Sequence, residues 1–398
     1  ESTNSNEITK TLSNEYFYIH KKISSALNEY KNDNSLLDIL TASKKNSKKL
    51  RKTGNLKSII EAIKSKITIT NDIFDNNPLL VCFQNGTYDL ESNIFRENRQ
   101  EDYIIKFNNY DFEIIKEDNK NMILLKSFLK KVMPVVEELD YLLLILSTVL
   151  YGRTLDNFVI CTGAGGNAKD TIFTFLMPKV ICDNYYKGNV NSITKKNNSG
   201  PNQELANCHK RNMLIFNEPN ADEKVITSNV KDMTGGDNVN ARGIYCSSTN
   251  TKLTCTLFML ANDLPLLDKV DQAMERRLIV FNFKTLFKKQ DYLDKYNIKE
   301  GSNGDGYHYY LADPYFQSLD FIEKVKLPMM NLLIQYFKKF KDNNFILSKS
   351  PKSIEDNNKN YLSSSDNFIS WFNSEYEISK NETDYIKLKD VYHNYKDS

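Results

Sequence analysis

The stretch "FVICTGAGGNAKDTIFTFLM", residues 158–177, decides how this chain folds. Phe158 to Thr162 predict a short buried strand, a glycine-rich turn follows, and "DTIFTFLM" predicts a helix. Between them, "GAGGNAKDT" has the length of the phosphate-binding loop G-x-x-x-x-G-K-[ST], with Lys169 in register. Such a loop binds phosphate oxygens through backbone N–H groups at a helix N-terminus. The stretch therefore predicts a nucleotide-binding α/β core.

Two loop positions depart from the usual motif. Ala168 stands where glycine is usual, but its backbone N–H remains, so we expect a mild effect. Asp170 stands where Ser or Thr usually supplies a hydroxyl to Mg²⁺, and a carboxylate there repels a triphosphate unless the metal lies between them. Thr171 offers a hydroxyl one residue later. Taken alone, the stretch is also compatible with a glycine-rich turn that binds no ligand.

Two later strands end in polar residues that suit the same chemistry. "NMLIFNEPN" predicts a strand ending in Asn217 and Glu218, and Glu218 is the candidate base that activates water. Asn217 replaces the more usual Asp, so metal binding depends more on Asp170 or Thr171. "TLFMLAND" predicts a strand ending in Asn262, which can contact the γ-phosphate or orient the water. A solvated glutamate at a strand end is the alternative for Glu218 alone.

Arg276 and Arg277 precede the apolar strand "LIVFNF". Arginines there can reach the nucleotide of a neighbouring subunit and stabilise transition-state charge, or they form a surface pair at a strand end. Three elements in this order favour a site for ATP and Mg²⁺. The expected catalytic residues are Lys169, Glu218, Asn262, Arg277 and Arg276, and the expected metal ligands are Asp170, Thr171 and Glu218. The expected nucleotide contacts are Gly163, Ala164, Gly165, Gly166, Asn167, Ala168, Lys169, Asp170 and Thr171.

Length and composition limit the class of protein. The chain has 398 residues, 40% hydrophobic and 26% charged, which is typical of a globular protein with two or three domains. A net charge of +2 means that any affinity for nucleic acid depends on local patches. The six cysteines have no C-x-x-C spacing, which argues against a zinc site or a disulfide framework. No apolar run is long enough to span a membrane, so we expect a soluble intracellular protein.

Hydrophobic patterns organise the rest of the chain. "NMILLKSFLKKVMPVVEELDYLLLILSTVLYGR" predicts two helices separated at Pro134, and "LLVCFQNGTYDL" predicts a strand followed by a tight turn at Asn85-Gly86. From residue 156 onward, short apolar strands alternate with helical stretches, which predicts an α/β fold with a mostly parallel sheet. "KVKLPMMNLLIQYFKKF" predicts a later helix, after a loop that contains "GSNGDG".

Longer motifs carry a family resemblance. They are "NGTYDL" at 85–90, "EDYI" at 101–104, the loop itself, "GPNQELANCHKRNMLIFNEPN" at 200–220, "VKDMTGGDNVNAR" at 230–242, "FMLANDLP" at 258–265 and "DQAMERRLIVFNF" at 271–283. With them the chain resembles superfamily 3 helicases of the poxvirus primase-helicase type, which are related to phage and plasmid primase-helicases and are widespread in large DNA viruses.

The resemblance implies a P-loop, AAA+-like ATPase domain behind a helical collar-type domain. It also implies a homo-hexameric ring that moves along single-stranded DNA, and a partner primase domain or other replication proteins. Asn262 matches the family's sensor position, and Arg277 lies where its arginine finger usually falls, with Arg276 as the fallback. The expected domains are a mainly helical collar-type region at 1–120, the ATPase domain at 121–290, and a C-terminal helical region at 291–398 that begins a small domain.

Two segments are candidates for contact with DNA. "GIYCSSTNTK", residues 243–252, predicts a hairpin, in which Arg242 and Lys252 would contact phosphates and Tyr245 would stack on a base or ribose. The alternative is a surface hairpin with solvated charges. The basic run "KKNSKKLRK", residues 44–52, places Lys44, Lys48 and Lys52 on one helical face, which either guides DNA or is simply solvated.

Three functions remain open on the sequence. The first is an ATP-dependent DNA helicase that acts on single-stranded or forked DNA during replication. The second is a DNA-binding ring or clamp that binds ATP but hydrolyses it poorly because of Asp170. The third is an AAA+ remodeller that acts on protein.

Overall fold

The computed structural model describes most of the chain, which divides into two compact units. The units are Glu1–Ile73 and Phe74–Ser398. The described residues are 5–29, 34–50, 54–55, 58–59, 62, 74–196, 207–220, 223–236, 238–241, 249–301, 303–365, 371–372, 375–376, 379, 381 and 385–397. None of the described helices is long and apolar enough to cross a membrane.

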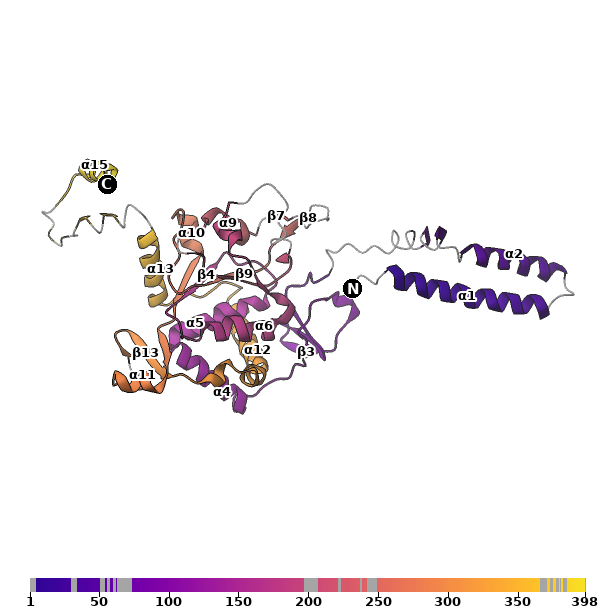
Figure 1. The fold of residues 1–398 in the computed structure, drawn as a ribbon, viewed down its shortest axis with the longest axis horizontal. Helices are drawn as coiled ribbons and strands as arrows, with labels where there is room; N and C mark the ends of the chain where they lie inside the picture. The colour runs from indigo at the N-terminus through magenta and orange to yellow at the C-terminus, as the bar shows by residue number, and fades with distance from the viewer. Residues whose placement is uncertain are drawn as a thin grey trace. The chain divides into compact units, whose positions relative to one another are not determined.

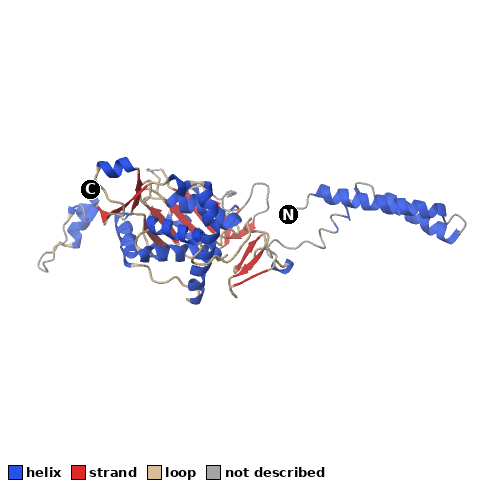
Figure 2. Ribbon diagram, turned by 90° about the horizontal axis from the view of Figure 1, so that it is seen from below, coloured by secondary structure: helices blue, strands red, loops and turns tan. Residues whose placement is uncertain are grey.

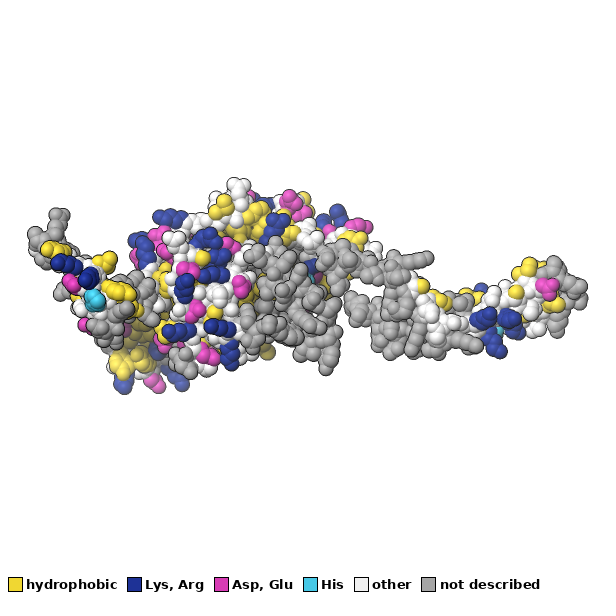
Figure 3. Space-filling model, turned by 90° about the horizontal axis from the view of Figure 1, so that it is seen from above, with side chains coloured by type: hydrophobic (Ala, Val, Ile, Leu, Met, Phe, Trp, Pro, Cys, Tyr) yellow, Lys and Arg dark blue, Asp and Glu magenta, His cyan; other side chains and the backbone are white. Residues whose placement is uncertain are grey.

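The first unit is a pair of helices, α1 (Ser5–Glu29) and α2 (Asn34–Leu50), which lie side by side (Figure 1). His20 Nδ1 and Ser47 Oγ are 2.7 Å apart and join the two helices. The last turn of α2 carries Lys48 and Lys49, and Figure 3 shows Lys and Arg side chains gathered on this unit. The predicted basic face thus begins on α2, whereas Lys52 lies outside the described residues.

The second unit is built on a five-stranded sheet with the order β10-β4-β9-β6-β5. All neighbouring strands in it are parallel, which confirms the predicted α/β fold with a parallel sheet. The three-residue edge strand β5 was not predicted from the sequence, whereas the other four strands of this sheet were. The strands are β4 (Phe158–Thr162), β5 (Tyr185–Lys187), β6 (Met213–Asn217), β9 (Thr256–Leu260) and β10 (Leu278–Asn282).

Helices cover both faces of this sheet (Figures 1 and 2), because alternate residues of each strand point to opposite sides. Val159 and Cys161 of β4 share one core with α4, α5, α6 and α12, while Phe158 and Ile160 share a second core with α7, α9, α10 and α13. The first set is α4 (Lys120–Val132), α5 (Val136–Ser147), α6 (Met177–Ile181) and α12 (Leu319–Asp342). The second set is α7 (Asn191–Thr194), α9 (Thr227–Thr234), α10 (Gln272–Arg277) and α13 (Lys352–Ser365). The predicted break at Pro134 is confirmed between α4 and α5.

At the β10 edge of the sheet, a side chain of α13 takes the hydrogen-bonding place of a further strand. Asn358 of α13 accepts a hydrogen bond from Val280 N at 2.8 Å and donates one to Leu278 O at 2.9 Å. Its amide therefore imitates a neighbouring backbone, and the free edge of β10 is protected from pairing with another chain.

A three-stranded antiparallel sheet precedes α4. It consists of β1 (Leu80–Phe83), β2 (Gly86–Asp89) and β3 (Ile94–Arg96). Phe83 pairs with Gly86, so the turn is Gln84-Asn85, one residue before the predicted Asn85-Gly86. The glycine is needed for another reason: a Cβ on Gly86 would lie 2.5 Å from the backbone oxygen of Arg96 on the neighbouring strand.

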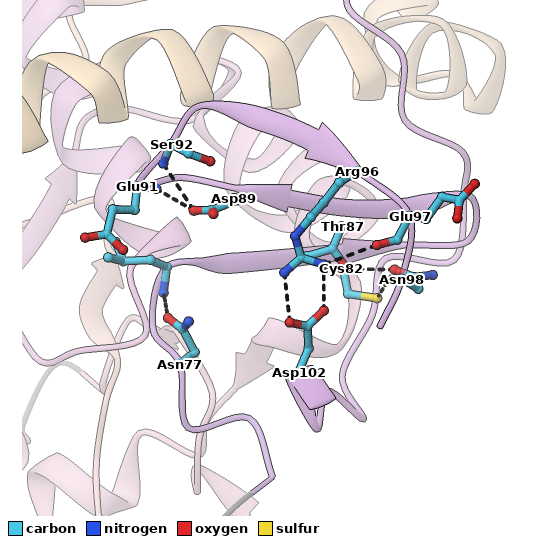
Figure 4. A network of polar contacts seen from close by, with 11 residues as sticks. Asn77, Cys82, Thr87, Asp89, Glu91, Ser92, Arg96, Glu97, Asn98 and Asp102 are labelled. Carbon is cyan, nitrogen blue, oxygen red and sulfur yellow. Dashed lines mark hydrogen bonds and ion pairs between the residues drawn. The ribbon is translucent and has the colours of Figure 1, made fainter. Parts of the chain in front are cut away.

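The "EDYI" and "NGTYDL" motifs have structural roles in this region. Arg96 donates to both carboxylate oxygens of Asp102 at 2.8 Å, which fastens the "EDYI" segment to β3 (Figure 4). The guanidinium holds the pKa of Asp102 below its usual value. Asn85 donates to Phe112 O and accepts from Phe112 N, both at 2.9 Å. The family motifs here maintain the fold.

The region predicted as a loop with "GSNGDG" contains a small sheet instead. The aromatic segment after this turn forms β13 (Tyr307–Leu311), which pairs with β11 (Thr285–Lys288) in parallel and with β12 (Asn303–Gly304) in an antiparallel manner. The predicted helix that follows is confirmed as α12. The three-part domain division stays a prediction. The remaining elements are η2 (Gln100–Asp102), η3 (Thr148–Leu150), η4 (Thr171–Leu176), η5 (Cys182–Asn184), β7 (Asn238–Ala241), β8 (Thr249–Lys252), α11 (Gln290–Lys295), η6 (Pro314–Gln317) and α15 (Leu388–Asp397).

Candidate nucleotide site

The predicted loop lies where the sequence placed it, between β4 and a helix that begins at Lys169 and continues as a π-helical segment, η4, into α6. Gly163 has a φ of +144° and Gly166 a φ of +80°, which only glycine adopts without strain. A Cβ on Gly163 would also lie 2.5 Å from the backbone oxygen of Phe283. The loop is therefore a tight turn that needs glycine at both of these positions.

Ala168 adopts a strained backbone conformation that the sequence did not reveal. Its φ is +63°, in the left-handed region, where a Cβ meets the following carbonyl oxygen. Glycine is usual at this position of the motif because it has no such contact. The substitution keeps the N–H, as expected, but it strains the loop.

Lys169 is buried against neutral acceptors. Its Nζ donates to the backbone oxygen of Gly163 and to Oδ1 of Asn262, both at 3.0 Å, and its side chain is only 4% exposed. Burial lowers the pKa of Lys169, while Asp170 and Glu218 act in the opposite direction. An ammonium group has three donors, so one N–H remains for a phosphate oxygen.

Glu218 is joined to the same segment. Its carboxylate accepts from Asn262 N at 3.0 Å and from Asp263 N at 3.3 Å. Asn262 also accepts from Gly163 N at 3.3 Å through its backbone oxygen. The loop, the end of β6 and the end of β9 thus meet at the carboxyl edge of the parallel sheet, where α/β proteins bind ligands. The strand next to the loop strand is β9, and β6 is one strand further away.

Asn167 supplies a feature that sequence reasoning treated only as part of the loop. Its Oδ1 accepts from Lys169 N at 3.2 Å, and its Nδ2 has no hydrogen-bond partner among the described residues although the side chain is 2% exposed. A buried donor without a partner is costly unless a ligand provides the acceptor. With Lys169 and the glycine turn, this donor set fits an anionic phosphate. The signal available in the sequence was an amide side chain inside a glycine-rich turn.

The candidate metal ligands differ in exposure. Asp170 is exposed and lies in the first helical turn, whereas Thr171 is buried, with 1% of its surface exposed. Asn217, at the end of β6, is exposed. The negative charges of Asp170 and Glu218 both act to raise the pKa of Lys169.

The two arginines have different environments. Arg277, the last residue of α10, is 7% exposed; its Nε donates to Thr234 Oγ1 and its Nη1 donates to Ala273 O, both at 2.9 Å. Arg276 is exposed, with one nitrogen 3.4 Å from Asp156 Oδ2. The structure brings Lys169, Glu218 and Asn262 together, and it places neither arginine in contact with them.

The predicted hairpin is confirmed by the antiparallel pairing of β7 with β8, in which Lys252 pairs with Asn238. Arg242 and Tyr245, the other expected DNA contacts, lie outside the described residues. Their roles stay predictions.

Comparison with known proteins gives consistent matches. Residues 7–134 match the family model described as "D5 N terminal like". A protein named as a putative helicase in Acanthamoeba polyphaga mimivirus is 30% identical over 323 residues, which is 80% of this chain and 33% of that protein. The Primase D5 of fowlpox virus is 26% identical over 296 residues, 71% of this chain and 36% of that protein. The chain therefore spans about a third of the length of these relatives.

Among solved structures, the apo C-terminal region of NrS-1 matches with a TM-score of 0.44 and 14% identity, covering 80% of this chain and 70% of that one.

Proposed function

Because the chain belongs to the primase-helicase family of large DNA viruses, we propose that it is the ATP-hydrolysing part of a replicative DNA helicase. One observation supports this most strongly: Lys169 Nζ donates to Asn262 Oδ1, and Glu218 binds the backbone of the same Asn262. Three residues from three separate segments converge beside a glycine turn. A ligand-free structural turn has no need of this convergence.

The residues suit a nucleoside triphosphate with Mg²⁺. Lys169, the unpartnered Nδ2 of Asn167 and the backbone N–H groups of the loop would hold the phosphates. Mg²⁺ would neutralise phosphate charge, with Asp170 as the exposed carboxylate closest in sequence to the loop lysine, and Thr171 and Glu218 as the other proposed ligands. In this proposal Asp170 takes the place of the usual hydroxyl.

Glu218 has the capacity to position the attacking water. Each carboxylate oxygen has two lone pairs, and the bonds from Asn262 N and Asp263 N occupy one on each oxygen. The remaining lone pairs can accept a proton from water. The two amide bonds fix the orientation of the carboxylate, which is what a general base requires.

We further propose that the chain assembles as a hexamer and translocates on single-stranded DNA. The proposed DNA contact is the β7–β8 hairpin, with Lys252 on β8. Arg242 and Tyr245, which follow β7 in the sequence, are the other two proposed DNA-binding residues. The α1–α2 pair is the proposed collar. Arg276 is exposed and therefore better placed than Arg277 to reach a neighbouring subunit.

The test is strand separation by the purified chain. With ATP, Mg²⁺ and a forked duplex, we expect unwinding that Lys169→Ala abolishes. Lys179→Ala is the matched control, because Lys179 is an exposed lysine on α6 outside the loop. A chain without any ATPase activity, with or without single-stranded DNA, would contradict the proposal.

A clamp that binds ATP but hydrolyses it poorly is the second candidate. The exposed carboxylate of Asp170 beside Lys169 favours it, since two like-charged groups, carboxylate and triphosphate, repel each other. Asp170→Ser separates the two functions. If serine creates hydrolysis where the natural chain has none, the chain is a clamp; if serine reduces an existing rate, Asp170 is a working ligand.

A further inference from the structure

A separate cavity of about 220 Å³ adjoins the loop on the side of Gly166, Ala168 and Thr171. Lys169 does not line it. Pockets that enclose a whole drug-sized ligand have about 300–1,000 Å³, so this cavity has room for only part of a nucleotide. Which part of the nucleotide fits follows from the residues that line the cavity and from where they lie along the loop.

Aromatic rings form its walls. Phe128, Phe287 and Phe316 line the cavity, and the last two are half-buried, so their surfaces are partly free. The ring centroids of Phe128 and Phe316 are 5.0 Å apart, and Phe316 also lies 5.2 Å from Phe321. Phe316 is therefore held in place by neighbouring rings before any ligand arrives.

Phe287 is tied to the loop itself. Its backbone N donates to Gly166 O at 2.8 Å. Two residues earlier on β11, Thr285 Oγ1 donates to Lys131 O at 2.8 Å, which fastens the strand to α4. Loop and aromatic wall consequently keep a fixed spacing, as a site for one rigid molecule requires.

The electrostatics of the cavity do not suit phosphate. None of the described residues that line it is basic, and Asp313 places a carboxylate at its rim. The Oδ1 of Asp313 accepts from Tyr315 N at 2.9 Å, which fixes this carboxylate. Gln317, which also lines the cavity, is exposed. A neutral ring with N–H donors and acceptors at its edge suits these groups, whereas an anion does not.

The expected orientation of a bound triphosphate also favours a base, rather than a phosphate, in this cavity. In phosphate-binding loops the lysine reaches the β- and γ-phosphates, so the α-phosphate and nucleoside lie away from it. Here Lys169, Asn262 and Glu218 mark the proposed γ end, and none of the three is among the residues that line the cavity. We propose that the cavity binds the base of the nucleoside triphosphate, which stacks on Phe287 and Phe316 with Asp313 and Gln317 at its edge. This inference rests on the proposed nucleotide site.

Binding measurements on the whole chain test it by comparing ATP with inorganic tripolyphosphate, which has no base. Stacking on an aromatic ring contributes to the affinity for a base, so Phe316→Ala should weaken ATP binding roughly 10-fold and leave tripolyphosphate binding unchanged. Phe287→Ala should do the same. Phe175→Ala is the matched control, because Phe175 is 48% exposed and does not line the cavity. Titration calorimetry gives both affinities without any need for turnover.

Further variants separate the causes of any loss. Phe316→Leu retains apolar packing against Phe128 but removes the ring, so it should also weaken ATP selectively if stacking matters. Lys169→Ala should weaken both ligands. Equal affinity of the natural chain for ATP and tripolyphosphate, or equal losses for both ligands in the phenylalanine variants, would overturn the base pocket alone. Failure of the natural chain to bind either ligand would overturn the proposed nucleotide site and the base pocket with it.

Discussion

The Nζ of Lys169 lies 3.0 Å from Oδ1 of Asn262, although the two residues are 93 positions apart in the chain. Asn262 also contacts the loop strand through its backbone oxygen, which accepts from Thr162 Oγ1 at 2.9 Å. The residue proposed to bind phosphate is thus bonded directly to the residue proposed to sense it. A phosphate that binds the Lys169 ammonium therefore affects its hydrogen bond to Asn262, at the end of β9. Because Asn262 N also donates to Glu218, the same change can reach the Glu218 carboxylate.

The first prediction concerns this contact. Asn262→Ala should reduce ATP hydrolysis by about 10²-fold, the typical effect of removing one polar group that stabilises a transition state. ATP binding should change much less, because Lys169 keeps its bond to Gly163 O. Steady-state hydrolysis and calorimetric affinity check the two effects separately. Asn360→Ala, on the exposed side of α13, is the control; unchanged hydrolysis in Asn262→Ala would remove Asn262 from the mechanism.

The second prediction concerns strain in the loop. Ala168→Gly should stabilise the protein by about 0.5–1 kcal/mol, because the relief of a left-handed alanine exceeds the added entropy of glycine in the unfolded chain. Thermal or urea unfolding measures this. Ala164→Gly is the matched control: Ala164 is an exposed loop residue without a positive φ, and its replacement should give no stabilisation. A destabilised Ala168→Gly variant would show that the strain is absent.

The third prediction separates the two arginines. Arg277→Ala should lower the free energy of unfolding by about 1–3 kcal/mol, because it leaves Thr234 Oγ1 and Ala273 O without their donor inside the protein. Arg276→Ala should leave stability unchanged and reduce DNA-stimulated hydrolysis, since its side chain is exposed and its one ion pair, with Asp156, lies on the surface, where a neighbouring subunit's nucleotide can replace it. Denaturation curves and hydrolysis assays distinguish them. A stable, inactive Arg277→Ala variant would instead assign the transition-state role to Arg277.

The fourth prediction concerns acid. The pKa of Asp102 is lowered in the folded protein, chiefly by the hydrogen bonds from Arg96. A lowered pKa means that the contribution is present above the unfolded value of 3.8 and is lost as pH falls through the folded value. Asp102→Asn should therefore unfold at a lower urea concentration than the natural chain at pH 7, and the difference should shrink below about pH 4. A difference that persists unchanged at pH 2 would rule out ionisation of Asp102 as its cause.

Helices α4, α5 and α12 and four of the five strands of the central sheet could be predicted because their signals are local. "FVICT" and "LIVFNF" are short apolar runs, and the loop between β4 and η4 carries its glycines in fixed positions. The turn at Gln84-Asn85 was placed one residue too late, because Gly86 serves a contact with β3 rather than the turn. The β12–β13 pair was missed because its strands are short and one of them is only two residues long.

By itself the sequence determined that a strand, a glycine turn and a helix would form around Lys169, and that Glu218 and Asn262 would follow at strand ends. These are properties of neighbouring residues and of their order. Only the tertiary structure decided that β9 lies between β4 and β6, so that Asn262 rather than Glu218 touches Lys169. It also decided that Arg277 is buried and that Phe287 and Phe316 flank the loop. Strand order and burial depend on pairing between segments far apart in the chain, and no local pattern specifies that pairing.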